Sequence, residues 1–358
     1  MEIKNLKKKF SKKKDGKVLI ISGKNSFFKI NGDKFLKKYL PKNTNLYYYF
    51  KYSNNPDFKE LKIIVKKIKK INPTLIIAIG GGCVMDYAKS ANVLAADNTL
   101  NIKQKFDKRL TSLLCIPTTA GTGAEITPSA VLYVNNKKTN VEGPAVKPNF
   151  FYLEPKFIKY NNKYTIASSG FDSFSQSIES ILSVKANKES INFAKKSIKL
   201  TLSNLIKFYN EKKEIHAKKL LYAANFSGKA ISISSTGAPH ALSYIFSSHF
   251  NLSHGHSVSL NTLKVIKFNF LNQNKSKILK KRLNILFKCF DCKNYDQFEK
   301  KIEFILKKLN LEQNFKKLKI SEKKLFSLKK FISLKRLKNN IIKINGKDID
   351  NILFQRYA

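Results

Sequence analysis

The pattern of strands and helices changes once along the chain, and this change constrains the fold more than any other feature. The first 150 residues alternate short β-branched runs with helical stretches, whereas the chain from about residue 160 shows long helical periods. Buried strands are predicted at 18–22, 46–50, 75–79 and 113–117, and a helix at 56–71. Such alternation predicts a mostly parallel sheet covered by helices, which binds ligands at the carboxyl ends of its strands.

The length of the chain indicates two domains, because 358 residues exceed what one hydrophobic core fills. We expect an α/β Rossmann-like N-terminal domain over residues 1–157 and an all-α C-terminal domain over residues 158–358. In the second domain, helical spacing predicts core positions at Ile302, Ile305, Leu309, Leu325 and Leu328.

The formal net charge of +45 raises the question of a polyanionic partner. The lysines are spread through the chain, as in the runs Lys7–Lys14 and Lys66–Lys70 and across 275–347, and are mixed with Asn and Ile throughout. This distribution favours a diffuse compositional bias, so we expect no specific nucleic-acid partner. A nucleic-acid-binding protein is the alternative from a different class, and salt-dependent DNA binding without nucleotide binding would favour it.

Cysteine content and hydropathy predict a cytoplasmic protein. Four cysteines in a chain of this length do not form a disulfide framework, and Cys289 and Cys292 form a single CxxC without a second pair. The apolar run Val18–Ile21 is too short for a signal-peptide core, and no stretch approaches the roughly 20 apolar residues of a membrane span. We therefore expect reduced thiols and no membrane partner.

A glycine-rich turn follows the third predicted strand and opens a helix. Residues 79–89 read IGGGCVMDYAK. Glycines at such a turn let backbone N–H groups approach a pyrophosphate, and the helix presents its positive end to the same anion. The turn lacks the GxGxxG spacing, so by itself it is also compatible with a simple tight turn.

A second segment follows the fourth predicted strand. Residues 116–127 read IPTTAGTGAEIT, and their small hydroxyl and glycine residues can line a dinucleotide channel without blocking it. Together, GGGxxxDxAK and PTTAGTGxE closely resemble the two nucleotide-binding motifs of the iron-containing (group III) alcohol dehydrogenase family, in the same order and at the same separation.

The resemblance runs from about residue 18 to about residue 270. It implies a dehydroquinate-synthase-like fold of two domains and hydride transfer with NAD(P)H. NAD-preferring relatives place an Asp where Gly23 aligns, and its absence beside Lys24 permits NADP. The residues that the resemblance implies for cofactor binding are Gly23, Gly81, Gly82, Asp86, Thr118, Thr119, Thr122 and Lys138.

Two further segments correspond to the metal site of this family. Residues 169–180 read SGFDSFSQSIES and match a helix in which an Asp and a His four residues later bind the metal, but here the second position is Gln176. The segments APHALSY (238–244) and LSHGH (252–256) match the family's last two metal-binding histidines. The implied ligands of Fe²⁺ or Zn²⁺ are Asp172, Gln176, His240 and His254.

Gln176 stands where the family motif has a His, and this difference leaves two alternatives for the mechanism. An amide oxygen is a poorer ligand than imidazole, so Gln176 either completes the metal site or leaves room for water. In the other alternative no metal is bound, and His240 or His256 acts as general acid. The catalytic candidates are therefore His240, His254 and His256, while His216 and His249 are expected to be surface or structural residues.

Within this family the closest resemblance is to the phosphonoacetaldehyde reductases (hydroxyethylphosphonate dehydrogenases). It rests on the segments already quoted around Asp172 and His240 and on residues 228–234, GKAISIS. The resemblance implies reduction of phosphonoacetaldehyde to 2-hydroxyethylphosphonate by a homodimer or larger homo-oligomer. Cations or N–H groups must then bind the phosphonate, and the candidates are Lys147, Lys229 and Ser235.

Other functions on the same fold remain alternatives. These are a general alcohol or lactaldehyde dehydrogenase and a glycerol-1-phosphate dehydrogenase. The intact PTTAGTG segment and the spacing of His240 and His254 disfavour a cyclase of the dehydroquinate synthase kind. An inactive homologue that keeps the fold as a scaffold is a further alternative, suggested by Gln176 and disfavoured by the retained nucleotide motifs.

Overall fold

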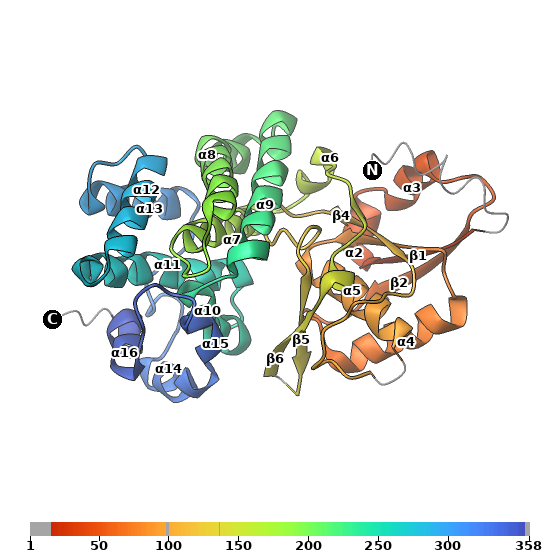
Figure 1. Ribbon diagram of the computed structural model, residues 1–358. Helices are drawn as coiled ribbons and strands as arrows, with labels where there is room; N and C mark the ends of the chain where they lie inside the picture. Colours follow the sequence, from red (N-terminus) through yellow and green to blue (C-terminus); the bar gives the residue numbers. More distant parts are fainter. Residues whose placement is uncertain (1–15, 98–99, 136, 355–358) are drawn as a thin grey trace. The chain divides into compact units, whose positions relative to one another are not determined.

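The computed structural model describes residues 16–97, 100–135 and 137–354 (Figure 1). The chain forms two compact units. The first contains the chain up to Thr119 together with Gly123–Tyr160, and the second contains Ala120–Thr122 together with the chain from Asn161 onward. The boundary expected between residues 157 and 158 stays a prediction. The lysine run Lys7–Lys14 lies outside the described residues.

The first unit is built on a parallel five-stranded sheet in the order β2-β1-β3-β4-β7. Its strands are β1 (Lys17–Gly23), β2 (Asn45–Lys51), β3 (Leu75–Gly80), β4 (Ser112–Pro117) and β7 (Phe150–Phe151). Its helices are α2 (Lys24–Lys29), α3 (Gly32–Tyr39), α4 (Phe58–Ile71), α5 (Gly82–Ala96), the 3-10 helix η2 (Pro144–Val146) and α6 (Pro155–Ile158). The four predicted strands and the predicted helix are confirmed.

Both faces of this sheet are buried, as its continuous apolar strands require. In β1, Leu19 and Ile21 pack into one core with residues of α4 and α5, while Val18 and Ile20 pack into another with residues of α2, α3 and α6. Helix α4 begins where the Asp57 side chain accepts hydrogen bonds from the next backbone N–H groups, a standard N-cap. The predicted α/β class of the N-terminal part is confirmed.

A two-stranded antiparallel sheet in the first unit was not anticipated. It joins β5 (Ser129–Val134) to β6 (Lys137–Glu142). Asn135 at its turn has a positive φ of 48°, a conformation that Asn tolerates better than most residues. The Asn-Asn pair after the apolar run Val131–Val134 is the signal in the sequence that could have identified this hairpin.

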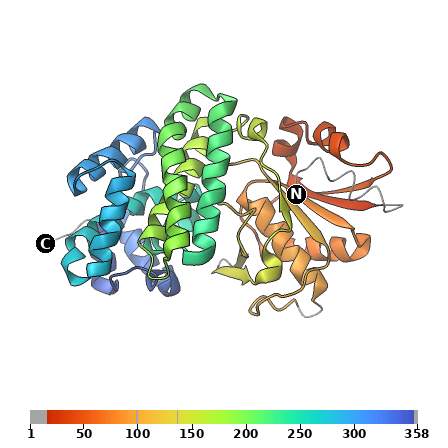
Figure 2. The same ribbon diagram turned by 45° about the horizontal axis from the view of Figure 1, so that its top comes forward.

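The second unit is helical in its described residues, which confirms the predicted all-α C-terminal part. Long helices α7 (Lys163–Ile181), α8 (Lys188–Glu211) and α9 (Glu214–Ser234) lie side by side (Figure 2). The remaining helices are α10 (Ala238–His249), α11 (His254–Leu271), η3 (Gln273–Lys275), α12 (Lys277–Cys289), α13 (Tyr295–Lys308), α14 (Glu322–Leu328), η4 (Lys329–Phe331), α15 (Leu334–Leu337) and α16 (Gly346–Phe354).

Helix α7 occupies the middle of this unit and is buried along most of its length. It contacts α8, α9 and α11, and the Asn162 side chain caps its first turn by accepting from the Thr165 N–H. The predicted core residues Ile302, Ile305, Leu309, Leu325 and Leu328 are all buried. Within the described residues, no helix combines the length and the low polarity that crossing a membrane demands.

Candidate active site

The two motif turns of the first unit lie at neighbouring strand ends. Gly80 ends β3 and Pro117 ends β4, and these residues are partners in the parallel register. The Thr118 N–H donates to the Gly80 carbonyl over 2.9 Å. A Cβ added to Gly81 would lie 3.4 Å from Thr119 Oγ1, so the second turn packs against the first. The structure therefore brings together two segments that the sequence separates.

The N-terminus of α5 is arranged for an anion. Gly81 is its N-cap residue, no side chain of that residue caps the helix, and the first turn carries no acidic residue. The first backbone N–H groups and the positive end of the helix dipole therefore point out beyond Gly81 and Gly82. A phosphate group fits this arrangement. Thr122, which sequence reasoning assigned to the same cofactor, belongs to the second unit.

Lys89 on α5 forms hydrogen bonds to the segment that follows the threonine-rich turn. The sequence did not predict this role. Its side chain is fully buried, and its Nζ donates to the Ala124 carbonyl, Thr127 Oγ1 and the Ser129 carbonyl at 2.9, 2.9 and 2.5 Å. Three acceptors match the three donors of an ammonium group, which makes its burial tolerable. The only signal in the sequence was its place in the motif, which does not identify the acceptors.

Asp86 and Lys138, both predicted to bind the cofactor, influence each other electrostatically. Burial raises the pKa of Asp86 to about 6, although the charges of Lys89 and Lys138 and a hydrogen bond from the Val131 backbone oppose the rise. Val131 and Lys138 belong to the β5–β6 hairpin, so this unanticipated hairpin places Lys138 where it acts on α5. The carboxylate of Asp86 is thus held in an environment that favours its protonated form.

Gly23 lies at the carboxyl end of β1, opposite Lys51 at the end of β2. It is also the N-cap residue of α2, whose first residue is Lys24. The Ser26 hydroxyl donates to the Gly23 carbonyl over 2.9 Å. Lys51 donates from Nζ to the Ser53 carbonyl. Two lysines therefore stand next to Gly23 at the carboxyl end of β1, Lys24 in sequence and Lys51 in register.

The second unit brings three ionisable side chains from three helices together. Asp172 comes from the middle of α7, His240 from the first turn of α10 and His254 from the first residue of α11. One donor atom of each lies within 4.8 Å of the others. The Asp172 Oδ1 atom is 3.2 Å from His240 Nε2 and 3.9 Å from His254 Nε2. These are three of the four predicted metal ligands.

The donor set suits a divalent transition metal. A carboxylate and two imidazoles bind Zn²⁺ or Fe²⁺ at about 2.0 to 2.2 Å, and donor atoms around such an ion lie roughly 3 to 4 Å apart. Asp172 and His240 are 3% exposed at their side chains, whereas His254 is 35% exposed. Two of the candidate ligands are therefore buried in the protein interior, and the third is partly exposed.

Gly255 allows α11 to begin against α7. A Cβ at this position would lie 1.8 Å from the Ser168 carbonyl oxygen and 3.1 Å from Asp172 Cβ. Any larger residue would push the start of α11 away, and His254 with it. The glycine between the two histidines of the HGH segment is therefore required by the close approach of two helix backbones.

Gln176 lies one turn after Asp172 and is buried. Its Oε1 atom accepts a hydrogen bond of 2.6 Å from Ser227 Oγ on α9. That oxygen is the only atom of the side chain able to bind a metal, because the amide nitrogen carries two hydrogens. Gln176 therefore has its oxygen engaged by Ser227, and its role as a metal ligand stays a prediction.

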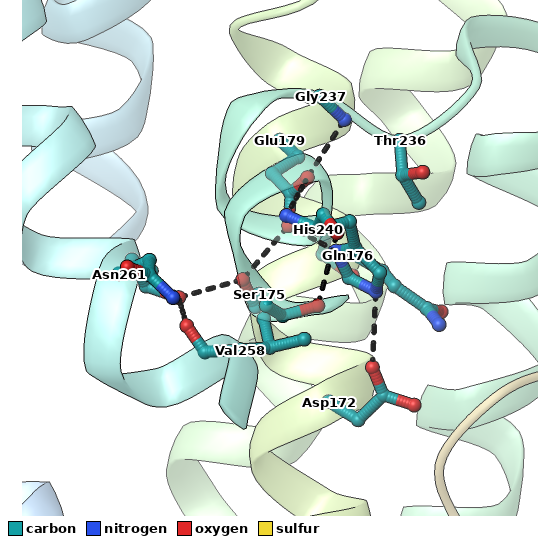
Figure 3. A network of polar contacts seen from close by, with 12 residues as sticks. Asp172, Ser175, Gln176, Glu179, Thr236, Gly237, His240, Val258 and Asn261 are labelled. Atoms are coloured by element: carbon teal, nitrogen blue, oxygen red, sulfur yellow. Dashed lines mark hydrogen bonds and ion pairs between the residues drawn. The ribbon is translucent and has the colours of Figure 1, made fainter. Parts of the chain in front are cut away.

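Glu179, two turns after Asp172 on α7, was not singled out from the sequence. Figure 3 shows the His240 ring between Glu179 and Asp172. Glu179 Oε1 lies 2.5 Å from His240 Nδ1 and accepts from Ser175 Oγ over 2.9 Å, while Oε2 accepts from the Gly237 N–H over 2.7 Å. Burial lowers the pKa of His240, but the Glu179 charge and the hydrogen bonds to both carboxylates outweigh it and raise the pKa above its ordinary value.

His256 is occupied by structural contacts. Its Nε2 lies 2.7 Å from the Glu312 carbonyl oxygen and its Nδ1 lies 3.2 Å from the Tyr164 hydroxyl. Burial lowers the pKa of the ring. Both nitrogens are therefore engaged, and this geometry gives no support to His256 as a general acid. His216 contacts Asn204, and His249 packs against Phe331.

Two family models match most of this sequence. Residues 1–155 match the model described as iron-containing alcohol dehydrogenase, and residues 166–357 match the C-terminal model of the Fe-containing alcohol dehydrogenase family. Curated proteins are also similar. The chain is 32% identical to aldehyde-alcohol dehydrogenase 2 of Entamoeba histolytica over 60% of this chain and 27% of that protein.

Two smaller relatives are matched over more of their length. The phosphonoacetaldehyde reductase of Streptomyces viridochromogenes is 29% identical over 58% of this chain and 56% of that protein. The 4-hydroxybutyrate dehydrogenase of Clostridium kluyveri is 25% identical over 72% of each chain. The match thus spans about half the length of the phosphonoacetaldehyde reductase and about a quarter of the Entamoeba protein.

Solved structures share the fold. An archaeal alcohol dehydrogenase from a Red Sea brine pool has a TM-score of 0.86 at 17% identity and covers 99% of this chain and 94% of its own. The iron-containing alcohol dehydrogenase of Thermotoga maritima has a TM-score of 0.77 at 24% identity, covering 96% and 92%. With both halves of the sequence matched by its models, the chain belongs to the iron-containing alcohol dehydrogenase family.

Proposed function

We propose that this protein is an NAD(P)H-dependent alcohol dehydrogenase that works as an aldehyde reductase. The observation that carries the proposal is the cluster of Asp172, His240 and His254, which forms a ligand set for a divalent metal in the second unit. In the first unit, two turns at the carboxyl ends of β3 and β4 would bind the phosphates of the cofactor. An inactive scaffold protein would need neither the metal-ligand cluster nor the phosphate-binding turns.

The proposed cofactor site uses the backbone of the first unit. The N–H groups at the start of α5 would bind the pyrophosphate, with Gly81 allowing its approach and Thr119 lining it. At Gly23 no carboxylate opposes a 2′-phosphate, and Lys24 and Lys51 stand beside it. We therefore propose that NADPH is accepted as well as NADH. Steady-state kinetics that show a strong preference for NADH would contradict this assignment.

The proposed metal site has three protein ligands. Asp172, His240 and His254 would hold the ion, and Gln176 keeps its oxygen on Ser227 and leaves a position open for water or substrate. A bound metal stabilises negative charge as it develops on the substrate oxygen during hydride transfer. Metal analysis of active protein tests this assignment. Full activity in metal-free protein would favour the alternative in which His240 acts as general acid.

For the substrate we propose a small anionic aldehyde, with phosphonoacetaldehyde as the first candidate. Relatives named for phosphonoacetaldehyde and for 4-hydroxybutyrate, both small anionic compounds, support this class. The excess of Lys and Arg gives the chain a field that attracts anions. The candidate Lys229 gains no support, because its Nζ lies over the rings of Phe193 and Phe226.

The test is to follow oxidation of NADPH and NADH with phosphonoacetaldehyde, uncharged aldehydes, lactaldehyde and dihydroxyacetone phosphate, with and without added Fe²⁺ or Zn²⁺. We expect the highest kcat/KM with phosphonoacetaldehyde. Equal or better turnover of uncharged aldehydes would keep the dehydrogenase and remove the phosphonate substrate. Oxidation of neither cofactor would contradict the proposed function. Size-exclusion chromatography of the same protein tests the expected homodimer or larger homo-oligomer.

A further inference from the structure

Glu179 occupies a position that links the metal ligand His240 to the start of α10. Helix α10 has Gly237 as its N-cap residue, which offers no side chain to cap the helix. Glu179 reaches across from α7 instead. Its Oε2 accepts from the Gly237 N–H over 2.7 Å and lies 3.4 Å from the His240 N–H. A carboxyl group from α7 therefore stands at the positive end of the α10 helix dipole.

The other oxygen of Glu179 determines how the His240 ring is presented. An ionised carboxylate can only accept hydrogen bonds, so the Nδ1 atom 2.5 Å away must carry a proton. In a neutral ring this places the lone pair on Nε2, which is the atom that faces Asp172. Ser175 also donates to Oε1, and the Ser175 hydroxyl in turn contacts Thr262 Oγ1 on α11. The carboxylate is thus fixed from α7, α10 and α11.

We infer that Glu179 is the positioning residue of the metal site, which holds the proton on His240 Nδ1 so that Nε2 is presented as a ligand. The inference rests on the proposed metal-dependent function and goes beyond it, since Glu179 itself lies on the far side of the ring from Asp172 (Figure 3). Carboxylates that accept from the second nitrogen of a metal-binding histidine typically contribute about 10- to 100-fold to metal affinity.

The substitution Glu179→Gln makes the sharpest test, because it keeps the size of the side chain and removes its charge. The amide presents a donor as well as an acceptor. If its oxygen stays with the Gly237 N–H, its NH₂ group faces His240 Nδ1 and forces the proton to Nε2, the atom needed for the metal. The measurement is the dissociation constant of Zn²⁺ and of Co²⁺ for the full chain, by competition with a chromophoric chelator.

We expect Glu179→Gln to weaken binding of both ions by about 10- to 100-fold. Ser175→Ala, which removes one donor to Glu179, should weaken binding by a few-fold. The matched control is Ser177→Ala, since Ser177 is buried on the same helix but donates to the Ser173 carbonyl of its own helix. That variant should bind like the wild type. Equal affinity of the wild type, Glu179→Gln and Ser175→Ala would overturn the inference and leave the proposed function standing.

A second measurement tests the role of Glu179 in metal-free protein. At a pH above the raised pKa of His240, where the ring is neutral, the ¹⁵N chemical shifts of His240 in metal-free protein report which nitrogen carries a proton. We expect a protonated Nδ1 in the wild type and loss of that proton in Glu179→Gln. An unprotonated Nδ1 in the wild type would overturn the inference even if Glu179→Gln failed to fold. If the wild type binds no metal, the proposed metal chemistry fails, and the state of Nδ1 still decides what Glu179 does.

Discussion

The two units of this protein recognise their proposed ligands by opposite means. The turns at Gly81 and Thr118 use backbone N–H groups and short side chains at open strand ends. The cluster around Asp172 uses ionisable side chains from three helices, two of them buried, and these are held by further buried polar groups. The first kind of site depends mainly on local backbone geometry. The second depends on how separate helices pack, so we expect it to be far more sensitive to single substitutions.

The largest effect should come from Asp172→Ala. This change removes the carboxylate shared by both histidines, and with it the metal and its stabilisation of developing charge. We expect kcat/KM to fall by about 10³-fold, equivalent to about 4 kcal/mol, and bound metal to be lost. The control is Asp296→Ala on the exposed first turn of α13, which should change neither quantity. Activity within tenfold of the wild type would contradict the expected sensitivity of the second unit to single substitutions.

Gly255→Ala should have the next largest effect, on stability. The added Cβ meets the Ser168 carbonyl at 1.8 Å, so α11 must shift away from α7. We expect a loss of about 3 kcal/mol in the free energy of unfolding, measured by urea denaturation, together with weaker metal binding. Gly346→Ala is the matched control, because nothing lies within 4 Å of its added Cβ. If both variants were equally stable, the packing argument for Gly255 would be wrong.

Gly81→Ala should have a smaller effect that is confined to the cofactor. The added methyl group lies 3.4 Å from Thr119 Oγ1, which the turn can accommodate, but it occupies the approach to the α5 N-terminus. We expect the KM for NADPH to rise about tenfold, roughly 1.4 kcal/mol, with metal affinity and thermal stability unchanged. A loss of metal from this variant would show that the two sites are not independent.

A further effect should be a pH dependence of stability from Asp86. Burial raises its pKa from 3.8 to about 6, so between these two pH values the folded state binds more protons than the unfolded state. Stability from this group is full below about pH 4 and is lost as the pH rises through about 6. Asp86→Asn should therefore unfold like the wild type at pH 4 and be more stable by up to about 3 kcal/mol at pH 7. If Asp86→Asn and the wild type had the same difference in unfolding free energy at pH 4 and at pH 7, the raised pKa of Asp86 would be contradicted.

The sequence predicted the geometry of the two turns more completely than it predicted the geometry of the Asp172 cluster. A glycine-rich turn after a strand and a second turn after the next strand imply their own geometry, because parallel strands end at one edge of a sheet. The structure pairs Gly80 with Pro117 accordingly. The predicted ligands Asp172, His240 and His254 also meet. Their supporting groups were not predictable, because a Glu seven residues after Asp172 does not reveal which helix end it will face.

Two other residues show the same limit. The sequence marks Lys89 only as a member of the glycine-rich motif, yet three oxygen atoms from residues 124–129 surround its ammonium group. His256 reads as a catalytic candidate because it follows His254 by two residues, yet that spacing turns it away from the metal ligands toward Tyr164 and Glu312. In both cases the partners lie far along the chain, and only the packing of helices and loops selects them.

The sequence by itself determined the order of the elements, the family and the candidate ligands Asp172, His240 and His254, because periodicity and motif spacing are local properties of the chain. Tertiary structure decided which atoms of those residues are available. It places Glu179 on His240 Nδ1 and Ser227 on the Gln176 oxygen, and it brings α11 against α7 at Gly255. The physical reason is that a buried polar atom must find a partner, and the partner nearest in space is set by helix packing rather than by position along the chain.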